Sequence, residues 1–149
     1  MPWTYRQASR EWAAFLDDAK EAIGTPTDHS TFTAVEGVLR AFRARLTLEQ
    51  SIVFAQVLPA VLRALFVANW TPAPPIAAGT RADWTAQAQS LRAHHNLAPA
   101  HVVMATALAL RKSVHFADLE ATLAQLPPFA AEFWRIDAPD PASLGPRIV

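Results

Sequence analysis

Apolar residues recur along most of the chain at intervals of three and four positions, which is the spacing of one buried helix face. The first such stretch spans residues 12–23 and stops at Gly24, and a second spans residues 32–46. Thr47 and Gln50 have the form of a capping box, which opens a further helix. No stretch alternates between apolar and polar residues as a half-buried strand does. The pattern therefore predicts an all-α fold.

One stretch of this pattern occurs twice. Residues 46–66 and 114–134 align without a gap when their Leu-Pro pairs are superimposed, at an offset of 68 positions. Each copy predicts a helix, a break at the proline, which cannot donate to a helical ladder, and a short helix that ends in aromatic residues. The same offset places Arg111 on Arg43. We predict a helical bundle made of two tandem pseudo-symmetric repeats of about three to four helices each, packed against each other.

The repeats divide a chain of 149 residues, which is the size of one compact domain. Thr80, with Asp83 three positions on, is expected to cap the opening helix of the second repeat, and Asp28 or Ser30 to cap the second helix of the first. The predicted divisions are helical repeat 1 over residues 11–70, a proline-rich linker over 71–79, helical repeat 2 over 80–136 and a loose C-terminal tail over 137–149.

Composition narrows the classes of protein that fit. Thirteen basic and thirteen acidic side chains give a net charge of zero, which argues against nucleic acid as a partner, because nucleic-acid binders usually carry a basic excess. A neutral chain with 52% hydrophobic residues favours self-association, so a homodimer is a working hypothesis. The absence of cysteine excludes disulfides and thiolate chemistry and fits a reducing compartment. Without a signal peptide or an uninterrupted apolar span, a cytoplasmic protein that does not cross a membrane is expected.

Three motifs of the chain carry a resemblance to a known family. They are Val38–Leu46, rich in leucine and arginine; Leu58-Pro59 followed by Arg63, Trp70 and Pro72; and Leu126-Pro127 followed by Phe133-Trp134. With this spacing the chain resembles, from Trp12 to Ile136, a bacterial family of domains of unknown function, the one numbered 2267. It looks like a divergent member, because apolar residues occupy most of positions 64–69, where the family tends to have glycines, tyrosines and an acid. The resemblance implies a helical repeat fold and no established chemistry.

The residue patterns of common catalytic and cofactor sites do not occur in the chain. Its four glycines lie far apart, so no phosphate-binding loop is present, and no serine occupies a Gly-x-Ser-x-Gly elbow. None of the five histidines has a second histidine, or a glutamate before it, at the spacing of a helical metal site. His94 and His95 are expected instead to bond the last carbonyls of a helix. We therefore expect no catalytic residue, no metal and no cofactor.

Four arginines are candidates for a contact surface: Arg40, Arg43, Arg63 and Arg111. Arg40 and Arg43 are three positions apart and share a helix face, and Arg43 and Arg111 match between the repeats. Because a guanidinium can bind a carboxylate or phosphate through two parallel hydrogen bonds, these side chains suit an anion or a partner protein. The alternative, which we favour, is internal ion pairing that fixes the helices. The glutamates expected for such pairing are Glu36, Glu49 and Glu132.

Most aromatic residues follow the spacing of a helical core and are expected to fill it, Phe66 and Trp134 among them. Trp70 stands beside the linker on no predicted helix, where it either plugs the seam between the repeats or is exposed for a partner. The leading hypothesis is a non-enzymatic protein-interaction or structural module, which contacts itself or another protein. The alternative is a small-molecule or lipid pocket between the repeats, lined by Phe66, Trp70, Phe133 and Trp134. Nucleic-acid binding through the arginines is a third and weaker hypothesis.

Overall fold

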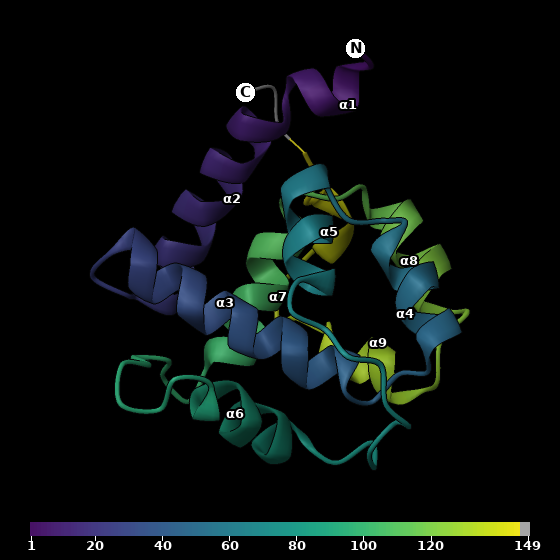
Figure 1. The fold of residues 1–149 in the computed structure, drawn as a ribbon. Coiled ribbons are helices and arrows are strands. Elements are labelled where there is room, and N and C mark those ends of the chain that lie inside the picture. Colours follow the sequence, from purple (N-terminus) through teal and green to yellow (C-terminus); the bar gives the residue numbers. More distant parts are fainter. Residues whose placement is uncertain (147–149) are drawn as a thin grey trace.

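Helices make up all the regular structure in the part of the chain that is described. The structure, a computed structural model, describes residues 1–146, and no strand occurs among them. The prediction of an all-α bundle is therefore confirmed (Figure 1). In chain order the elements are α1 (Trp3–Arg6), α2 (Ala8–Ile23), α3 (Asp28–Arg43), α4 (Leu48–Ala55), α5 (Ala60–Val67), α6 (Arg81–Ser90), α7 (Val102–Arg111), α8 (Phe116–Leu123), α9 (Phe129–Phe133) and the 3-10 helix η1 (Pro141–Ser143).

Two of the predicted caps begin helices where the sequence places them. At α4 the Thr47 hydroxyl accepts from the Gln50 amide at 3.2 Å, and the Gln50 side chain accepts from the Thr47 amide at 2.8 Å. At α6 the Asp83 carboxylate accepts from the Thr80 amide at 2.8 Å. Each cap satisfies backbone donors that have no partner within the helix. The predictions at Thr47 and Thr80 are therefore confirmed.

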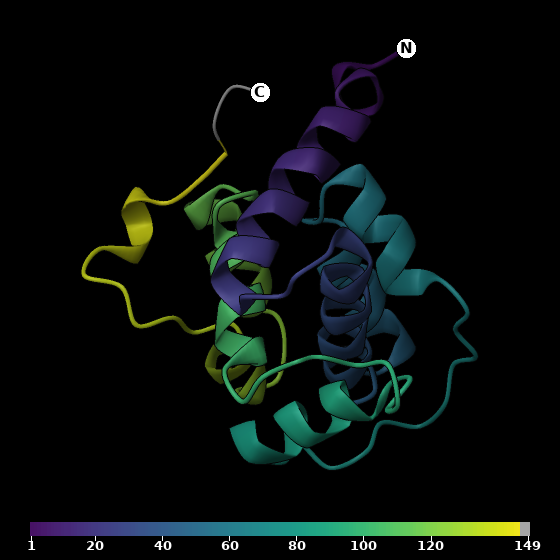
Figure 2. The same ribbon diagram turned by 90° about the vertical axis from the view of Figure 1, so that its left-hand side faces the viewer.

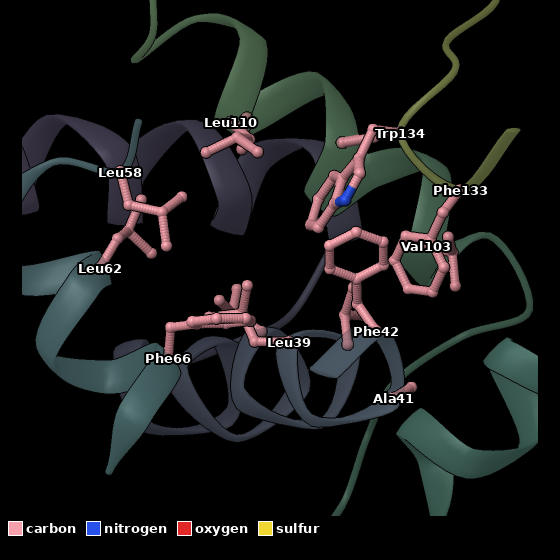
Figure 3. Packing of buried hydrophobic residues seen from close by; sticks show 14 of the residues in the cluster. Leu39, Ala41, Phe42, Leu58, Leu62, Phe66, Val103, Leu110, Phe133 and Trp134 are labelled. Carbon is pink, nitrogen blue, oxygen red and sulfur yellow. The ribbon is translucent and has the colours of Figure 1, made fainter. Parts of the chain in front are cut away.

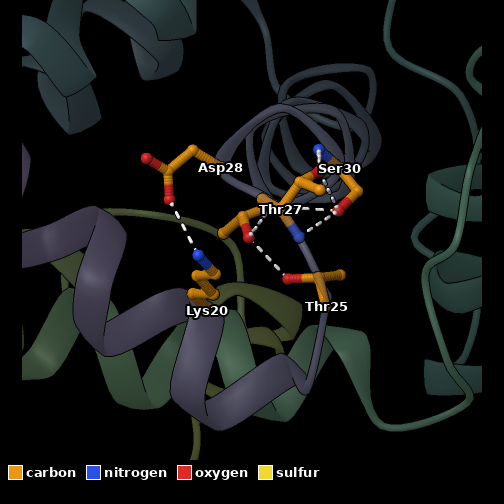
Figure 4. A network of polar contacts seen from close by, with 6 residues as sticks. Lys20, Thr25, Thr27, Asp28 and Ser30 are labelled. Carbon is orange, nitrogen blue, oxygen red and sulfur yellow. Dashed lines mark hydrogen bonds and ion pairs between the residues drawn. The ribbon is translucent and has the colours of Figure 1, made fainter.

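At α3 the prediction that Asp28 or Ser30 is the capping residue is wrong. The helix is capped by Thr27, whose hydroxyl accepts from the Ser30 amide at 3.0 Å while the Ser30 hydroxyl accepts from the Thr27 amide at 3.2 Å (Figure 4). Asp28 is the first helical residue and pairs with Lys20 on α2 at 3.3 Å. Thr27 has the extended backbone that a capping residue needs, so its hydroxyl, and not the Asp28 carboxylate, reaches the third amide.

The cap predicted for His94 and His95 is also wrong, because α6 ends at Ser90, before either histidine. The backbone becomes extended at Leu91, and Arg92 has a φ of 52°, so the helix cannot continue. The side-chain amide of Asn96 donates to the Leu91 carbonyl at 2.8 Å. The side-chain amide of Asn96, and not the imidazole of His94 or His95, therefore donates to a carbonyl at this helix end.

The first helix of each half packs mainly against the other half. Helix α2 lies along α7, and α6 lies along α3, each more extensively than along the helix that follows it (Figure 1). Gly37 of α3 permits the approach of α6, because a Cβ atom at this position would overlap the backbone carbonyl of Ala88. The two halves are therefore joined by two helix pairs that both run between them.

One hydrophobic core is shared by both halves. The ring of Phe42 on α3 lies 4.7 Å from that of Phe54, 4.8 Å from that of Phe133 and 5.3 Å from that of Trp134 (Figure 3). Phe66 and Trp134 are buried in this cluster, which agrees with the expectation that the aromatics fill the core. Such rings contribute large buried areas and preferred tilted contacts.

The segment between α5 and α6 and the segment after α9 lie on opposite sides of the bundle (Figure 2). Residues 71–79, predicted as the linker, form no helix and are exposed. The segment after α9 was expected to be loose, yet Ala138 and Leu144 pack against the core and η1 rests on α8. Residues 147–149, the end of that predicted tail, lie outside the described residues.

Some helix bounds recur at an offset of 68 positions. Helix α8, Phe116–Leu123, begins and ends 68 residues after α4, Leu48–Ala55, and the last turns of α3 and α7 end at Arg43 and Arg111. We call two residues counterparts when 68 positions separate them. The tandem repeat itself stays a prediction.

Candidate functional site

Arg43 and Arg111 bind the carboxyl ends of two short helices. Nη1 of Arg43 donates to the carbonyl of Phe66 at 2.7 Å, and Nε of Arg111 donates to the carbonyl of Trp134 at 2.8 Å. Both donors and both acceptors are counterparts, and both arginines are buried. Burial lowers the pKa of Arg43, and the nearby Arg40 lowers it further. Each guanidinium thus satisfies carbonyls that a helix leaves without a partner at its carboxyl end.

The surroundings of these two arginines differ. Nη1 of Arg111 also forms an ion pair with Glu120 at 3.0 Å. Arg43 has no such partner at the matching place, because the counterpart of Glu120 is Ile52. The guanidinium of Arg43 lies instead 5.0 Å from the centre of the Trp70 ring, which fits a cation–π contact. Trp70 is half-buried in this position, between the two alternatives that the sequence left open.

The other two candidate arginines are engaged elsewhere. Arg40 pairs with Glu36 at 3.8 Å, one of the internal pairs that the sequence suggested. Nε of Arg63 donates to the carbonyl of Ala55 at 2.9 Å, and Nη2 donates to that of Leu58 at 3.1 Å, so Arg63 binds the carboxyl end of α4. Each of the four arginines therefore binds groups of its own half, through bonds to backbone carbonyls more often than to glutamates.

A cleft of about 500 Å³ lies between the halves. This volume is in the range of sites for small molecules. One wall consists of residues three and four positions apart along α1 and α2. The other wall consists of the turns before α5 and before α8. The residues of the helical wall are Thr4, Gln7, Glu11, Ala14 and Asp18, and the turns contribute Val57, Leu58, Pro59, Lys112, Ser113, Val114 and His115.

Hydrogen-bond acceptors line the helical wall of this cleft. Asp18 is buried, with 8% of its surface exposed. Oε1 of Gln7 is buried and has no hydrogen-bond partner among the residues described. Because a buried acceptor without a partner is costly, this wall suits a ligand that donates hydrogen bonds.

The aromatic residues proposed for a pocket between the repeats do not line this cleft. Phe66, Phe133 and Trp134 are packed into the core, where the Trp134 and Phe54 rings stack at 5.5 Å. A second cavity, of about 380 Å³ beside α8, does not include them either. A ligand site between the halves therefore has other lining residues than the sequence suggested.

Large apolar side chains are exposed on α4 and at the end of α5. Leu48 and Ile52 lie one turn apart on α4 with 43% and 52% of their surface exposed, and Val67 at the end of α5 is 43% exposed. Their counterparts Phe116, Glu120 and Arg135 all line the cavity beside α8. We call Leu48, Ile52 and Val67 the α4–α5 face.

Sequence reasoning missed the residues of both surfaces. The available signal for the cleft was the polar residues at positions 4, 7, 11 and 18. Their spacing of three, four and seven positions places them in one line along a helix. For the α4–α5 face no signal exists, because Ile52 belongs to an apolar run that reads as core. Which part of such a run is buried depends on the neighbouring elements.

The fold defines the class of protein as an all-α bundle whose two halves share one core. The chain belongs to the family described as "Uncharacterized conserved protein (DUF2267)", whose model matches residues 12–133. The resemblance inferred from the motifs is therefore confirmed. No curated protein matches the chain. Within residues 1–146, none of the helices combines the length and the apolar content needed to cross a membrane.

Proposed function

We propose that this protein is a non-enzymatic protein-binding module of the cytoplasm, and that the α4–α5 face is its contact surface. The observation that carries the proposal is the exposure of Leu48 and Ile52, one turn apart on α4, together with that of Val67 at the end of α5. Single exposed aliphatic residues are common, but an adjoining group marks a surface for another protein. A second copy of the chain and a different protein are both partners that such a surface accepts.

The engagement of the arginines supports a binding role over a catalytic one. Arg43, Arg63 and Arg111 each donate to backbone carbonyls, and Arg40 pairs with a glutamate. Side chains held in this way fix helix ends and do not present an anion-activating group to a substrate. A partner then recognises the surface by its shape and its apolar character.

A photo-crosslinking amino acid placed at Ile52 tests this function. Introduced into the full-length chain in its native host, it is expected to give a discrete crosslinked product on illumination, because the side chain points to the proposed interface. The matched control is the same amino acid at Ala86, which is exposed on α6 away from the face. Equal products at the two positions, or none at Ile52, would contradict the proposal.

The cleft between the halves supports a second candidate function, the binding of a small molecule. Its support is the Gln7 acceptor, which has no partner in the described part of the chain and shares the helical wall of the cleft with the buried Asp18. A donor-rich ligand, such as an amine, is expected to raise the melting temperature of the protein. Gln7→Leu is expected to remove this shift while leaving the melting temperature without ligand unchanged. An amine panel that shifts the protein and the Q7L variant equally would rule this function out.

A further inference from the structure

Two side chains of opposite charge line the cleft between the halves without pairing with each other. Glu11 lies on the helical wall, and Lys112 lies in the turn before α8. Both side chains are half-buried, and neither forms an ion pair within residues 1–146. Because an ion pair requires a separation of at most about 4 Å, the carboxylate and the ammonium group are held further apart than that.

The helical wall offers negative charge and hydrogen-bond acceptors. Gln7, one turn before Glu11, contributes the buried Oε1 that has no partner among the described residues. Asp18, two turns after Glu11, adds a second carboxylate, and no basic side chain lines this wall in the described structure. Charge-assisted hydrogen bonds from an ammonium group to such acceptors are stronger than neutral ones. This wall therefore suits the ammonium end of a ligand.

The turn before α8 offers the opposite charge. The ammonium group of Lys112 and the hydroxyl group of the adjacent Ser113 both line the cleft and are hydrogen-bond donors. The other titratable groups of this wall are His115 and Asp118, and both are exposed, so solvent screens them more than it screens the half-buried Lys112. This wall therefore suits a carboxylate.

Apolar side chains contribute most of the remaining surface of the cleft. Leu58 and Val114 are buried there, and Ala14, Val57 and Pro59 are half-buried. In sites for small molecules, such side chains contact the carbon skeleton of the ligand, and a few polar groups fix its orientation. A ligand that matches this cleft is therefore a short aliphatic molecule with an ammonium group and a carboxylate.

We propose that the cleft binds a small aliphatic amino carboxylate, with its ammonium group at Glu11 and Gln7 and its carboxylate at Lys112. This inference rests on the second candidate function, the binding of a small molecule in the cleft, and specifies the class of ligand. One such molecule satisfies both charged side chains at once, although they do not reach each other. A ligand that lacks either charge leaves one of them without a partner and is bound less tightly.

Isothermal titration calorimetry of the full-length protein at pH 7 tests this inference. The probes are β-alanine, 4-aminobutanoate and 5-aminopentanoate, which differ only in the separation of their two charges. At least one of them is expected to bind about tenfold or more tightly than butylamine and butanoate, each of which has only one of the two charged groups. The probe that binds most tightly reports how far apart the cleft holds its two charges.

Two variants assign the two ends of the ligand. Glu11→Gln is expected to weaken binding of the amino carboxylate and of butylamine and to leave binding of butanoate unchanged. Lys112→Gln is expected to weaken binding of the amino carboxylate and of butanoate and to leave binding of butylamine unchanged. The matched control for Glu11→Gln is Glu21→Gln, which makes the same change of charge at an exposed position of α2 outside the cleft. It is expected to bind all probes as the parent protein does.

The possible failures are distinguishable. If butylamine binds as tightly as the best amino carboxylate, the inference is wrong and the second candidate function stands. Binding of the amino carboxylate that survives both Glu11→Gln and Lys112→Gln, or that falls equally in Glu21→Gln, would overturn the assignment of its two ends. If neither the amino carboxylates nor the amines bind, both the inference and the second candidate function are wrong.

Discussion

The α4–α5 and α8–α9 units have the same inner frame and different outer surfaces. In both, a buried arginine at the end of a long helix donates to a carbonyl at the end of a short one, at 2.7 Å and 2.8 Å. On the outside, Glu120 pairs with the buried Arg111 in one unit, whereas in the other unit its counterpart Ile52 is an exposed aliphatic residue and Trp70 lies against Arg43. The difference teaches that the buried arginine–carbonyl bonds maintain the fold in both units. The outer positions are not needed for this and are free to specify a contact.

The largest expected effect comes from the contact between the halves. Gly37→Ala places a methyl group against the backbone carbonyl of Ala88, which cannot move without shifting α6. We expect a loss of about 3 kcal/mol in the free energy of unfolding, measured by urea denaturation. The counterpart of Gly37 is the buried Ala105 of α7, which carries the methyl group that position 37 cannot take, so the expected loss distinguishes the two positions.

Gly145→Ala is the control for adding a methyl group where nothing opposes it, because a Cβ atom there meets no atom of the described residues within 4 Å. It is expected to change the free energy of unfolding by no more than about 0.5 kcal/mol. A Gly37→Ala variant as stable as the control would show that α6 packs on α3 less closely than the structure has it.

A smaller effect distinguishes the two buried arginines. Arg111→Met leaves the Trp134 carbonyl without its donor and Glu120 without its ion pair, so a loss of about 2 kcal/mol is expected. Arg43→Met leaves the Phe66 carbonyl without its donor but also removes a buried charge that has no ion-paired carboxylate, so about 1 kcal/mol is expected. Urea denaturation of both variants measures the difference. A larger loss for Arg43→Met would mean that the Trp70 contact outweighs the Glu120 ion pair.

The fold could be predicted from the sequence where local chemistry determines it. Gly24 ends α2 with a φ of 83°, a conformation that glycine adopts freely, and Pro59 separates α4 from α5. Thr47 and Thr80 fix two helix starts through bonds within four residues. The end of α6 could not be predicted, because the carbonyls there bond to Asn96, which lies beyond the turn.

Much less of the candidate site could be predicted. The sequence identified Arg43 and Arg111 as matching residues, but it suggested glutamates as partners where both arginines bind carbonyls 23 positions along the chain. Helical spacing says which residues share a face and not what that face meets. Arg45 and Ala44 hold the linker along the end of α3 through contacts that no local pattern encodes.

The smallest expected effect concerns the first helix of each half and depends on pH. Helix α6 begins with an acid in its cap, whereas Gln7 at the start of α2 makes no side-chain cap bond. The hydrogen bond from the Thr80 amide, helped by that from the Thr80 hydroxyl, lowers the pKa of Asp83 below its ordinary value of 3.8. A carboxyl whose pKa is lower in the folded state stabilises it above the ordinary pKa, and this contribution is lost as the pH falls through the folded value.

Asp83→Asn keeps an acceptor in the cap but removes its titration, so it isolates this contribution. At pH 7 the variant is expected to be slightly less stable than the parent protein in urea denaturation, and the difference is expected to shrink as the pH falls below 3.8. Hydrogen exchange of the α6 amides, compared with those of α2, locates the effect, because only α6 has the titrating cap. A stability difference that stays constant from pH 7 to pH 2, or equal acceleration of exchange in both helices, would show that the Asp83 cap does not distinguish the two halves.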